Sequence, residues 1–203
     1  ASIRLVTISN AFTWSVDTAF LGPIHTYAFH ATGNEVQDSF AAKANGSPTT
    51  ADTGQTYLHS YSTTSDAELR VVSGHLTNIV ASGAGAGYSQ LTLTEKVAVM
   101  GAKFKFNNTT AGSSIVLIAM EDSIAGGIVG GAQNSSFHYV VNPATWAFQQ
   151  IDAGTVTASI ASGTYTALTA DTEYTTEIIL EDDRAYIQLP TGQMVVVNDS
   201  RIA

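Results

Sequence analysis

The sequence contains no cysteine, which excludes a cysteine-ligated zinc site, a thiol nucleophile and a disulfide framework. Charged residues are also scarce, at 12% of the 203 residues, where ~25% is typical of globular proteins. The composition disfavours a helical bundle or a coiled coil, which need lysine, arginine, glutamate and leucine in quantity. No apolar run approaches the roughly 18 residues that a membrane-spanning helix needs, so we expect no membrane insertion.

Basic residues are the scarcer of the two charged classes. Eight lysines and arginines stand against 17 aspartates and glutamates, which gives a formal net charge of −9. Nucleic acids and anionic membrane surfaces are bound by cationic patches. The nearest approach to such a patch is the group Lys96, Lys103 and Lys105. Neither kind of partner is therefore expected.

Threonine, serine and glycine are abundant, with 26, 19 and 17 residues. Threonine favours half-buried strand positions, and glycine favours tight turns. Apolar and polar residues alternate in short runs that end at Gly, Asn, Asp or Pro, which is the pattern of β-strands. The clearest expected strands are 97–106, 114–120, 137–141, 155–160, 177–180, 185–189 and 193–197.

Three stretches indicate how the strands are arranged. The C-terminal stretch 177–197 joins three strands by two short turns, which predicts an antiparallel meander. Residues 114–120 are continuously apolar, which predicts a central strand covered on both faces. Residues 69–80 have apolar residues at helical spacing, but Gly74 and the β-branched residues oppose a helix. We favour two strands, 68–72 and 75–79, around a turn at Ser73 and Gly74.

Many short strands with regular turns predict an all-β fold, an antiparallel two-sheet β-sandwich of the jelly-roll kind. Residues 37–203 are expected to form this sandwich. Residues 1–36 differ in character, and we expect an N-terminal connector or outer strands there, with a role in subunit contact.

The acidic residues lack the spacing of a sandwich glycosidase. Enzymes of the laminarinase type carry Glu-x-Asp-x-Glu on one strand, which aims two carboxylates into one cleft. Here the acids fall at 121–122, 173, 177 and 181–183. The five histidines form no metal motif, and no Gly-x-Ser-x-Gly elbow marks a nucleophile. We therefore expect neither enzymatic activity nor a cofactor. A calcium loop at 181–183 is the alternative to a solvated hairpin turn.

Saccharide binding is the chemistry that the remaining residues favour. The apolar face of a sugar packs on an aromatic ring, and its hydroxyls bond to amides, hydroxyls and carboxylates. The aromatic candidates are Tyr57, Tyr61, Trp146, Tyr165 and Tyr186, for each of which core packing is the alternative. Four residues in turn-rich segments are the predicted ligand-binding set: Tyr57, Tyr61, Asn134 and Trp146.

Residues 38–57 resemble a recurrent module of tailed phages. Asp38-Ser-Phe40 is followed by Ala44-Asn-Gly-Ser-Pro and by Ala51-Asp-Thr-Gly-Gln-Thr-Tyr57. The module opens with Asp-x-Phe, a loop, and Asp-Thr-Gly-Gln with an aromatic residue. It is the concanavalin A-like (laminin G-like) jelly roll of minor tail and fibre proteins, and the resemblance covers residues 37–203. Tyr57 stands where the module usually has tryptophan, and the acidic strand of its glycosidase members is missing.

The resemblance implies a non-enzymatic, lectin-like protein of a phage tail, fibre or spike, placed at the virion surface and outside the host cell. Its expected partners are a host cell-surface glycan, other virion proteins and further copies of itself, in a trimer rather than a dimer. Linked copies would strengthen weak sugar binding. Two alternatives stay open: a structural spacer or decoration subunit without a ligand, and a glycan depolymerase with a site assembled across loops or subunits. The charge of −9 favours a neutral saccharide over an acidic one.

Overall fold

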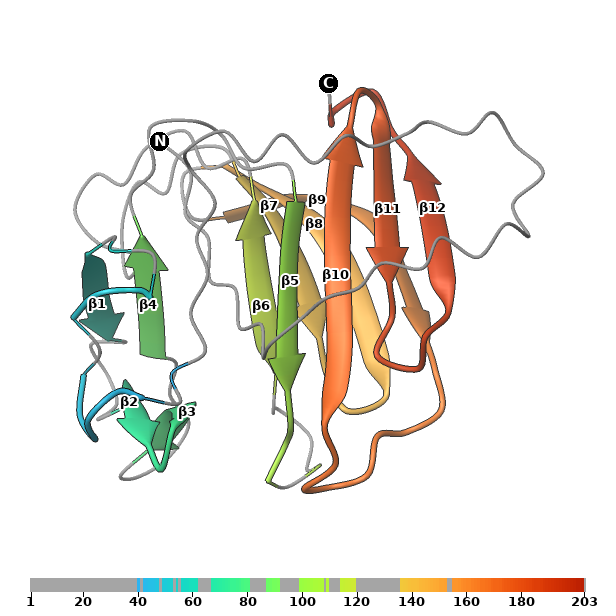
Figure 1. Ribbon diagram of the computed structural model, residues 1–203. Helices are drawn as coiled ribbons and strands as arrows, with labels where there is room; N and C mark the ends of the chain where they lie inside the picture. Colours follow the sequence, from blue (N-terminus) through green and yellow to red (C-terminus); the bar gives the residue numbers. More distant parts are fainter. Residues whose placement is uncertain are drawn as a thin grey trace.

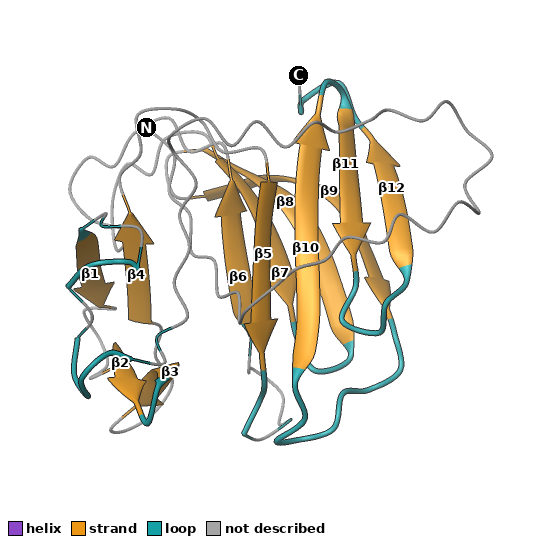
Figure 2. Cartoon of the chain, in the orientation of Figure 1, coloured by secondary structure: helices purple, strands orange, loops and turns teal. Residues whose placement is uncertain are grey.

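The computed structural model describes residues 40, 42–47, 49–52, 54, 56–61, 67–80, 87–91, 99–107, 109, 114–119, 136–152 and 155–202. These residues form twelve strands and no helix (Figure 2). None of them belongs to a helix long and apolar enough to span a membrane. Residues 1–36 lie outside the described residues, so their role as a connector or subunit contact stays a prediction.

Two four-stranded antiparallel sheets lie face to face (Figure 1). The front sheet has the order β12-β11-β10-β5, and the back sheet has the order β6-β7-β8-β9. The front strands are β5 (Val99–Phe104), β10 (Tyr174–Glu181), β11 (Arg184–Gln188) and β12 (Met194–Asn198). The back strands are β6 (Ile115–Ala119), β7 (Ser136–Val141), β8 (Thr145–Asp152) and β9 (Thr155–Thr164). The predicted all-β antiparallel sandwich is confirmed, while its jelly-roll and concanavalin A-like topology stays a prediction.

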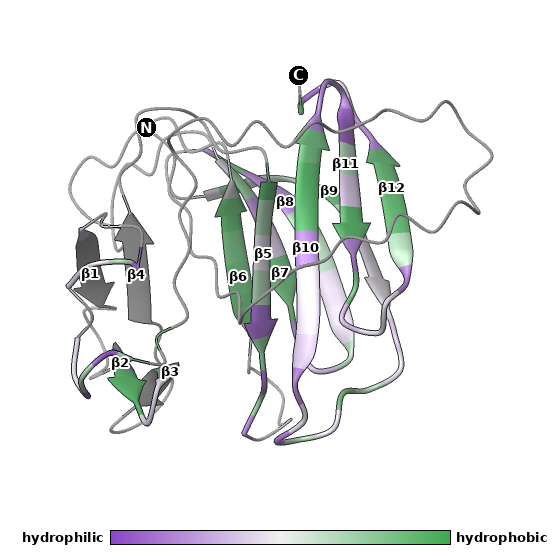
Figure 3. Ribbon diagram, in the orientation of Figure 1, coloured by the Kyte–Doolittle hydropathy of each residue, from purple (hydrophilic) through white to green (hydrophobic). Residues whose placement is uncertain are grey.

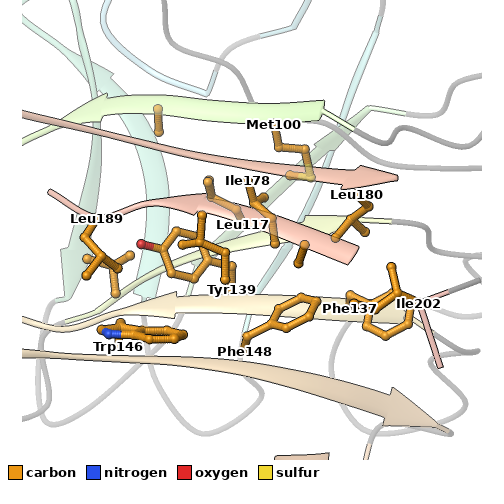
Figure 4. Close-up of a cluster of buried hydrophobic side chains, with 14 residues drawn as sticks. Met100, Leu117, Phe137, Tyr139, Trp146, Phe148, Ile178, Leu180, Leu189 and Ile202 are labelled. Atoms are coloured by element: carbon orange, nitrogen blue, oxygen red, sulfur yellow. The ribbon is translucent and has the colours of Figure 1, made fainter. Parts of the chain in front are cut away.

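One hydrophobic core fills the space between the two sheets (Figure 4). Alternate residues of each strand point into it, as the period of two in the sequence requires. The front sheet and the chain after it supply Met100, Ala102, Ile178, Leu180, Ala185, Ile187, Leu189 and Ile202. The back sheet supplies Leu117, Phe137, Tyr139, Val141, Trp146 and Phe148. The Phe137 and Phe148 rings stack with their centroids 5.6 Å apart. The sandwich is held together mainly by this burial of apolar area.

A small polar network crosses this core. The Tyr139 side chain of β7 is fully buried, and its hydroxyl is hydrogen-bonded to the Thr176 hydroxyl of β10 at 2.9 Å. The Thr176 hydroxyl donates to the Gln188 backbone carbonyl of β11 at 2.7 Å. Burial raises the pKa of Tyr139, so its hydroxyl stays neutral at all ordinary pH values. The network therefore fixes the back sheet against two strands of the front sheet with no buried charge.

Replacing Thr176 by valine is expected to lower the free energy of unfolding by about 1–3 kcal/mol, because a buried hydroxyl then loses its good partner. The Tyr139 hydroxyl would retain only the Gln188 carbonyl at 3.5 Å. Tyr139→Phe is expected to cost less, since Thr176 still donates to Gln188. Urea unfolding of the three proteins checks this order. A larger loss for Tyr139→Phe than for Thr176→Val would contradict the central place of Thr176 in the network.

The C-terminal meander forms as the sequence predicts. β10 and β11 are joined by the two-residue turn Asp182 and Asp183, with Glu181 opposite Arg184. β11 and β12 are joined through Pro190, Thr191 and Gly192. In this turn the Gly192 N–H donates to the Leu189 carbonyl at 2.8 Å. Gly192 has a φ of 84°, which side chains disfavour, so glycine is the residue that this turn requires.

The ambiguous stretch 69–80 is a hairpin and not a helix. β2 (Ala67–Val72) pairs with β3 (His75–Val80), and Val72 lies opposite His75. The two turn residues both have positive φ, 50° at Ser73 and 77° at Gly74, as in the primed turns that join twisted strands. A second pair joins β1 (Tyr57–Tyr61) to β4 (Gly87–Leu91). The two pairs contact each other, and Figure 1 shows them to one side of the sandwich.

The prediction for residues 114–120 is half right. The strand forms as β6, but among the described residues it lies at one end of the back sheet and pairs only with β7. Leu117 is buried, whereas Ile115, Val116 and Ile118 are half-buried. β6 lies against β5 of the front sheet. The strand is therefore apolar because it closes a side of the sandwich, and not because it is central.

Candidate functional site

The candidate site is the outer face of the front sheet, formed by the side chains that alternate with those of the core. Strand register places four apolar residues side by side across this face. Val99 lies opposite Ile179, Ile179 opposite Tyr186, and Tyr186 opposite Val196. We call these four residues the apolar row. Val196 is 53% exposed, and the other three are half-buried.

Polar side chains border the apolar row on both sides. On one side the register aligns Asn198, Arg184 and Glu181, and on the other it aligns Gln188 and Glu177 beside Met194. A hydrogen bond with the side chain of Tyr186 raises the pKa of Arg184, so the guanidinium stays charged beside the apolar row. Gly101, opposite Glu177, adds no side chain to the face. The face thus has an apolar centre that contains one aromatic ring, with amide, guanidinium and carboxylate groups around it.

An ion pair lies beyond this border, where β5 ends and β10 begins. The Lys103 ammonium is 2.7 Å from a Glu173 carboxylate oxygen. The hydrogen bond from Lys103 lowers the pKa of Glu173. Both side chains are well exposed to water, so this pair contributes little to stability. Its effect is to neutralise charge at the end of the face.

The predicted binding residue Trp146 lies in the core. Its side chain is 6% exposed and meets the Tyr139 ring edge-on, with centroids 6.5 Å apart. Gly163 lies opposite it on β9, and a Cβ atom at that glycine would come within 2.8 Å of the Trp146 Nε1. The ring therefore has no face open to a ligand in solution. Core packing, the alternative that the sequence left open, is its role here.

The other predicted binding residues are not brought together by the described part of the structure. Tyr57 and Tyr61 are the first and last residues of β1, and their side chains lie outside the described part. Asn134 lies wholly outside it. The Tyr165 hydroxyl donates to the Asn142 carbonyl, and burial raises its pKa to about 12, so Tyr165 has a structural role. Of the aromatic candidates whose side chains the structure describes, Tyr186 is the one on the outer face of a sheet, where it is half-buried.

The residues that carry the resemblance to the phage module have local structural roles. Phe40 is fully buried. The Lys43 ammonium donates to the Thr50 carbonyl at 2.7 Å and to the Asp52 carboxylate at 3.0 Å. The Gly54 N–H donates to the Ala51 carbonyl at 2.9 Å with a φ of 96°. This motif shapes a turn, so its presence identifies no ligand-binding group.

Ser136 and His138 lie on the same side of β7, on the outer face of the back sheet. The Ser136 Oγ and the His138 Nε2 are buried and have no hydrogen-bond partner among the described residues. Burial lowers the pKa of His138 to about 4, so the imidazole is neutral at pH 7. A catalytic base must be bonded to its nucleophile. The pair therefore lacks the hydrogen bond that would activate a serine.

The turn at 181–183 is a hairpin turn, as the simpler interpretation predicts. Asp182 and Asp183 are exposed, and the Asp183 carbonyl accepts a bond from the Asp199 N–H at 2.7 Å. Within the described ranges no group of three or more His, Asp or Glu side chains could hold a metal ion. The calcium loop thus gains no support from the arrangement of these carboxylates.

Comparison with protein-family models, curated proteins and solved structures finds no match for this chain. Its function is therefore inferred from the geometry of the outer front face and from the resemblance at residues 38–57.

Proposed function

We propose that this protein binds a neutral saccharide on the outer face of its front sheet and has no enzymatic activity. We further propose, on the resemblance at residues 38–57, that it is a virion protein of a tailed phage and that the saccharide belongs to the host cell surface. The observation that carries the binding proposal is the placement of Tyr186. Its half-buried side chain lies in the middle of the outer face of the front sheet, with polar groups on both sides.

The chemistry of this face suits a pyranose ring. A tyrosine ring such as that of Tyr186 can pack against the apolar face of a sugar. Ile179 and Val196 continue the apolar surface on either side of it. Gln188, Asn198 and the Arg184 guanidinium supply hydrogen bonds of fixed direction at the border. A hydroxyl bond to the protein replaces an equally good bond to water. We therefore expect a single site to bind with a dissociation constant roughly in the micromolar to millimolar range.

The two carboxylates of this face support binding over hydrolysis. Glu177 and Glu181 lie four residues apart on β10, on opposite sides of the apolar row. Four residues of a strand span about 13 Å. Retaining glycosidases need their carboxyl groups at about 5 Å and inverting ones at about 6.5–9.5 Å. This pair is too widely spaced for either mechanism.

A second function, as a spacer or decoration subunit without a ligand, is favoured by a different observation. Val196 and Met194 are 53% and 47% exposed on the same face. Exposed apolar side chains that lie together often mark contacts between proteins. If the outer front face is covered by another virion protein, it is not open to a saccharide.

Tyr186→Ala is expected to weaken saccharide binding at least tenfold, because the loss of a buried ring contact removes about 1.5–3 kcal/mol. Tyr186→Phe keeps the ring and is expected to stay within about threefold of the wild-type affinity. The reason is that a bond between the Tyr186 hydroxyl and the sugar would only replace a bond to water. Val156→Ala, an exposed position on β9, is the matched control and should bind normally.

The measurement is a glycan array with the labelled protein, followed by titration of each variant with the best ligand. Incubation with host polysaccharide and an assay for new reducing ends tests the depolymerase alternative. Binding that survives Tyr186→Ala unchanged would move the site elsewhere on the molecule. Failure to bind any glycan or host cell would favour the spacer function.

A further inference from the structure

β12 is the last strand of the front sheet, and its sequence carries no protection against pairing with another strand. Among the described residues it pairs only with β11. Its five residues, Met194-Val-Val-Val-Asn198, include no charged side chain and no proline. Figure 3 shows hydrophobic colour along most of this strand. Edge strands in monomeric proteins are usually interrupted by a lysine, a proline or a bulge, because free backbone groups recruit other strands.

Two of the three other strands at the ends of the two sheets carry such features, and the third, β6, is uncharged like β12 but lies against β5. β5 has Lys103 within it, and it lies against β6 at the side of the sandwich. β9 pairs with β8 through two irregularities, at Phe148/Gln149 and at Gln150/Ile151. β12 has a regular register along its whole length. It is therefore the end strand on which a partner strand would fit best.

The hydrogen bonds at its two ends show which backbone groups of β12 are turned outward. The Leu189 N–H donates to the Gln193 carbonyl at 2.8 Å, and the Asp199 N–H donates to the Asp183 carbonyl at 2.7 Å. Backbone groups of an antiparallel strand point to alternate sides. The odd-numbered residues thus bond to β11. Met194, Val196 and Asn198 direct their N–H and C=O groups away from β11, to the edge where no other described strand pairs.

We propose that β12 pairs with β12 of a second copy of this chain, antiparallel, about a two-fold axis at Val196. Val196 is the middle residue of the strand, so this register overlaps all five residues of both copies. It also makes Val196 opposite Val196 a hydrogen-bonded pair, because Val196 is one of the outward residues. Such a contact is isologous and closes at two copies.

This register also joins the side chains of the two outer front faces. The two Val196 side chains, each 53% exposed in a single chain, become cross-strand neighbours. Met194, 47% exposed, comes to lie opposite Asn198 of the second copy. The two apolar rows then form one row across an eight-stranded sheet. A partner with a charged edge strand would leave that charge beside these apolar side chains, so an uncharged copy of β12 fits better.

The proposal rests on the edge of β12 and not on the saccharide-binding function. It differs from the trimer that the resemblance implies, because a two-fold contact gives two copies. Pairing along five residues buries less surface than the ~1,200–2,000 Å² that standard stable interfaces bury. We therefore expect reversible association at micromolar concentrations.

Cysteine cross-linking tests the register directly, because the chain has no cysteine of its own. In Val196→Cys the two Cα atoms would be about 5.5 Å apart across the axis, within the range of a disulfide. In Met194→Cys the two cysteines would be about 13 Å apart, which is too far. After mild oxidation at micromolar concentration, Val196→Cys is expected to give a covalent dimer on non-reducing gels. Met194→Cys and the control Val156→Cys are expected to stay single chains.

Sedimentation equilibrium from micromolar to submillimolar concentration gives the mass in solution. The wild-type chain is expected to reach twice 21.2 kDa, and Val196→Lys to stay at 21.2 kDa. Val156→Lys adds the same charge at another exposed valine and should dimerise normally. A single-chain mass at every concentration, a trimer, a dimer that survives Val196→Lys, or the absence of a Val196→Cys cross-link would each overturn the proposal. Circular dichroism verifies that each variant is folded, and an unfolded Val196→Lys would leave the decision to the cross-linking.

Discussion

Replacing Trp146 by alanine is expected to lower the free energy of unfolding by about 3–5 kcal/mol, as for other large aromatic side chains removed from a core. Trp146 is 6% exposed and packs with Tyr139, Leu189 and other residues of both sheets (Figure 4). Its removal leaves a cavity between the sheets, since the strands on either side are held by their own hydrogen bonds. The loss would be a large part of the ~5–15 kcal/mol that stabilises a typical domain.

Guanidinium chloride unfolding, followed by far-ultraviolet circular dichroism, measures this loss. Ser162→Ala, at an exposed residue of β9, is the control and is expected to change stability by less than about 0.5 kcal/mol. A loss below about 1 kcal/mol for Trp146→Ala would contradict core packing. Any loss of saccharide binding in this variant must be judged on the folded fraction only, because Trp146 does not reach the outer front face.

The same packing can be tested from the neighbouring strand. A Cβ atom at Gly163 would lie 2.8 Å from Nε1 and 3.2 Å from Cε2 of Trp146. Gly163→Ala should therefore destabilise the wild-type protein and should cost much less when Trp146 is already alanine. A double-mutant cycle measures that coupling. Equal costs in the two backgrounds would mean that the ring and the glycine do not contact each other.

The folded protein is expected to lose about 2–3 kcal/mol of stability between pH 6.5 and pH 4 because of His138. The ordinary pKa of histidine is 6.5, and burial lowers that of His138 to about 4. Between these two values the unfolded chain binds a proton that the folded chain does not. The stability that depends on a neutral His138 is therefore fully present above pH 6.5, and it is lost as the pH falls toward 4. Below that value both states are protonated and the loss is complete.

The residues paired with His138 do not offset the lowering of its pKa by burial. Ile118 lies opposite it on β6 and Gln149 lies opposite it on β8, and neither can stabilise an imidazolium by charge. The hydrogen bonds from Arg201 lower the pKa of Asp199 to about 2, so this group adds an acid-dependent loss only below the ordinary pKa of 3.8. Asp199 forms a single ion pair with Arg201 at the surface of the molecule, so that effect is small. The effect of His138 on the free energy of unfolding can thus be measured between pH 6.5 and pH 4.

Unfolding midpoints at pH 7, 5.5 and 4.5 measure the effect. His138→Gln, which cannot take up a proton, is expected to show a much flatter pH dependence than the wild type. His75→Gln, at the exposed first residue of β3, is the control and should keep the wild-type slope. A wild-type slope in His138→Gln would assign the acid sensitivity to another group.

Local turns were the most predictable features. The hairpin at Ser73 and Gly74 has the two-residue loop expected from the sequence, and the turn expected at 181–184 forms with its loop shortened to Asp182 and Asp183. Such turns depend on the φ values of a few adjacent residues, and alternation of apolar side chains fixes which face is inward. The inner and outer faces of β10, β11 and β12 follow from these two signals.

The binding set was less predictable. Trp146 and Phe148 are two residues apart, so the alternation of side chains along a strand places both on one side of β8. It does not say whether that side is the core or the solvent, because both faces of β8 carry apolar residues. Tyr186 was one of five equal aromatic candidates, and no property of its own segment favoured it.

The sequence by itself determined the all-β class, the antiparallel meander and the hairpin at 67–80, since these follow from side-chain alternation and turns between adjacent residues. Only the tertiary structure decided that β5 pairs with β10 and that the two sheets face each other through Trp146 and Tyr139. The β5–β10 pairing adds Val99 to the apolar row beside Ile179, and it leaves β12 as the other end strand of the described front sheet. The physical reason is that pairing between distant strands depends on the total apolar area buried between two sheets, which no local pattern contains.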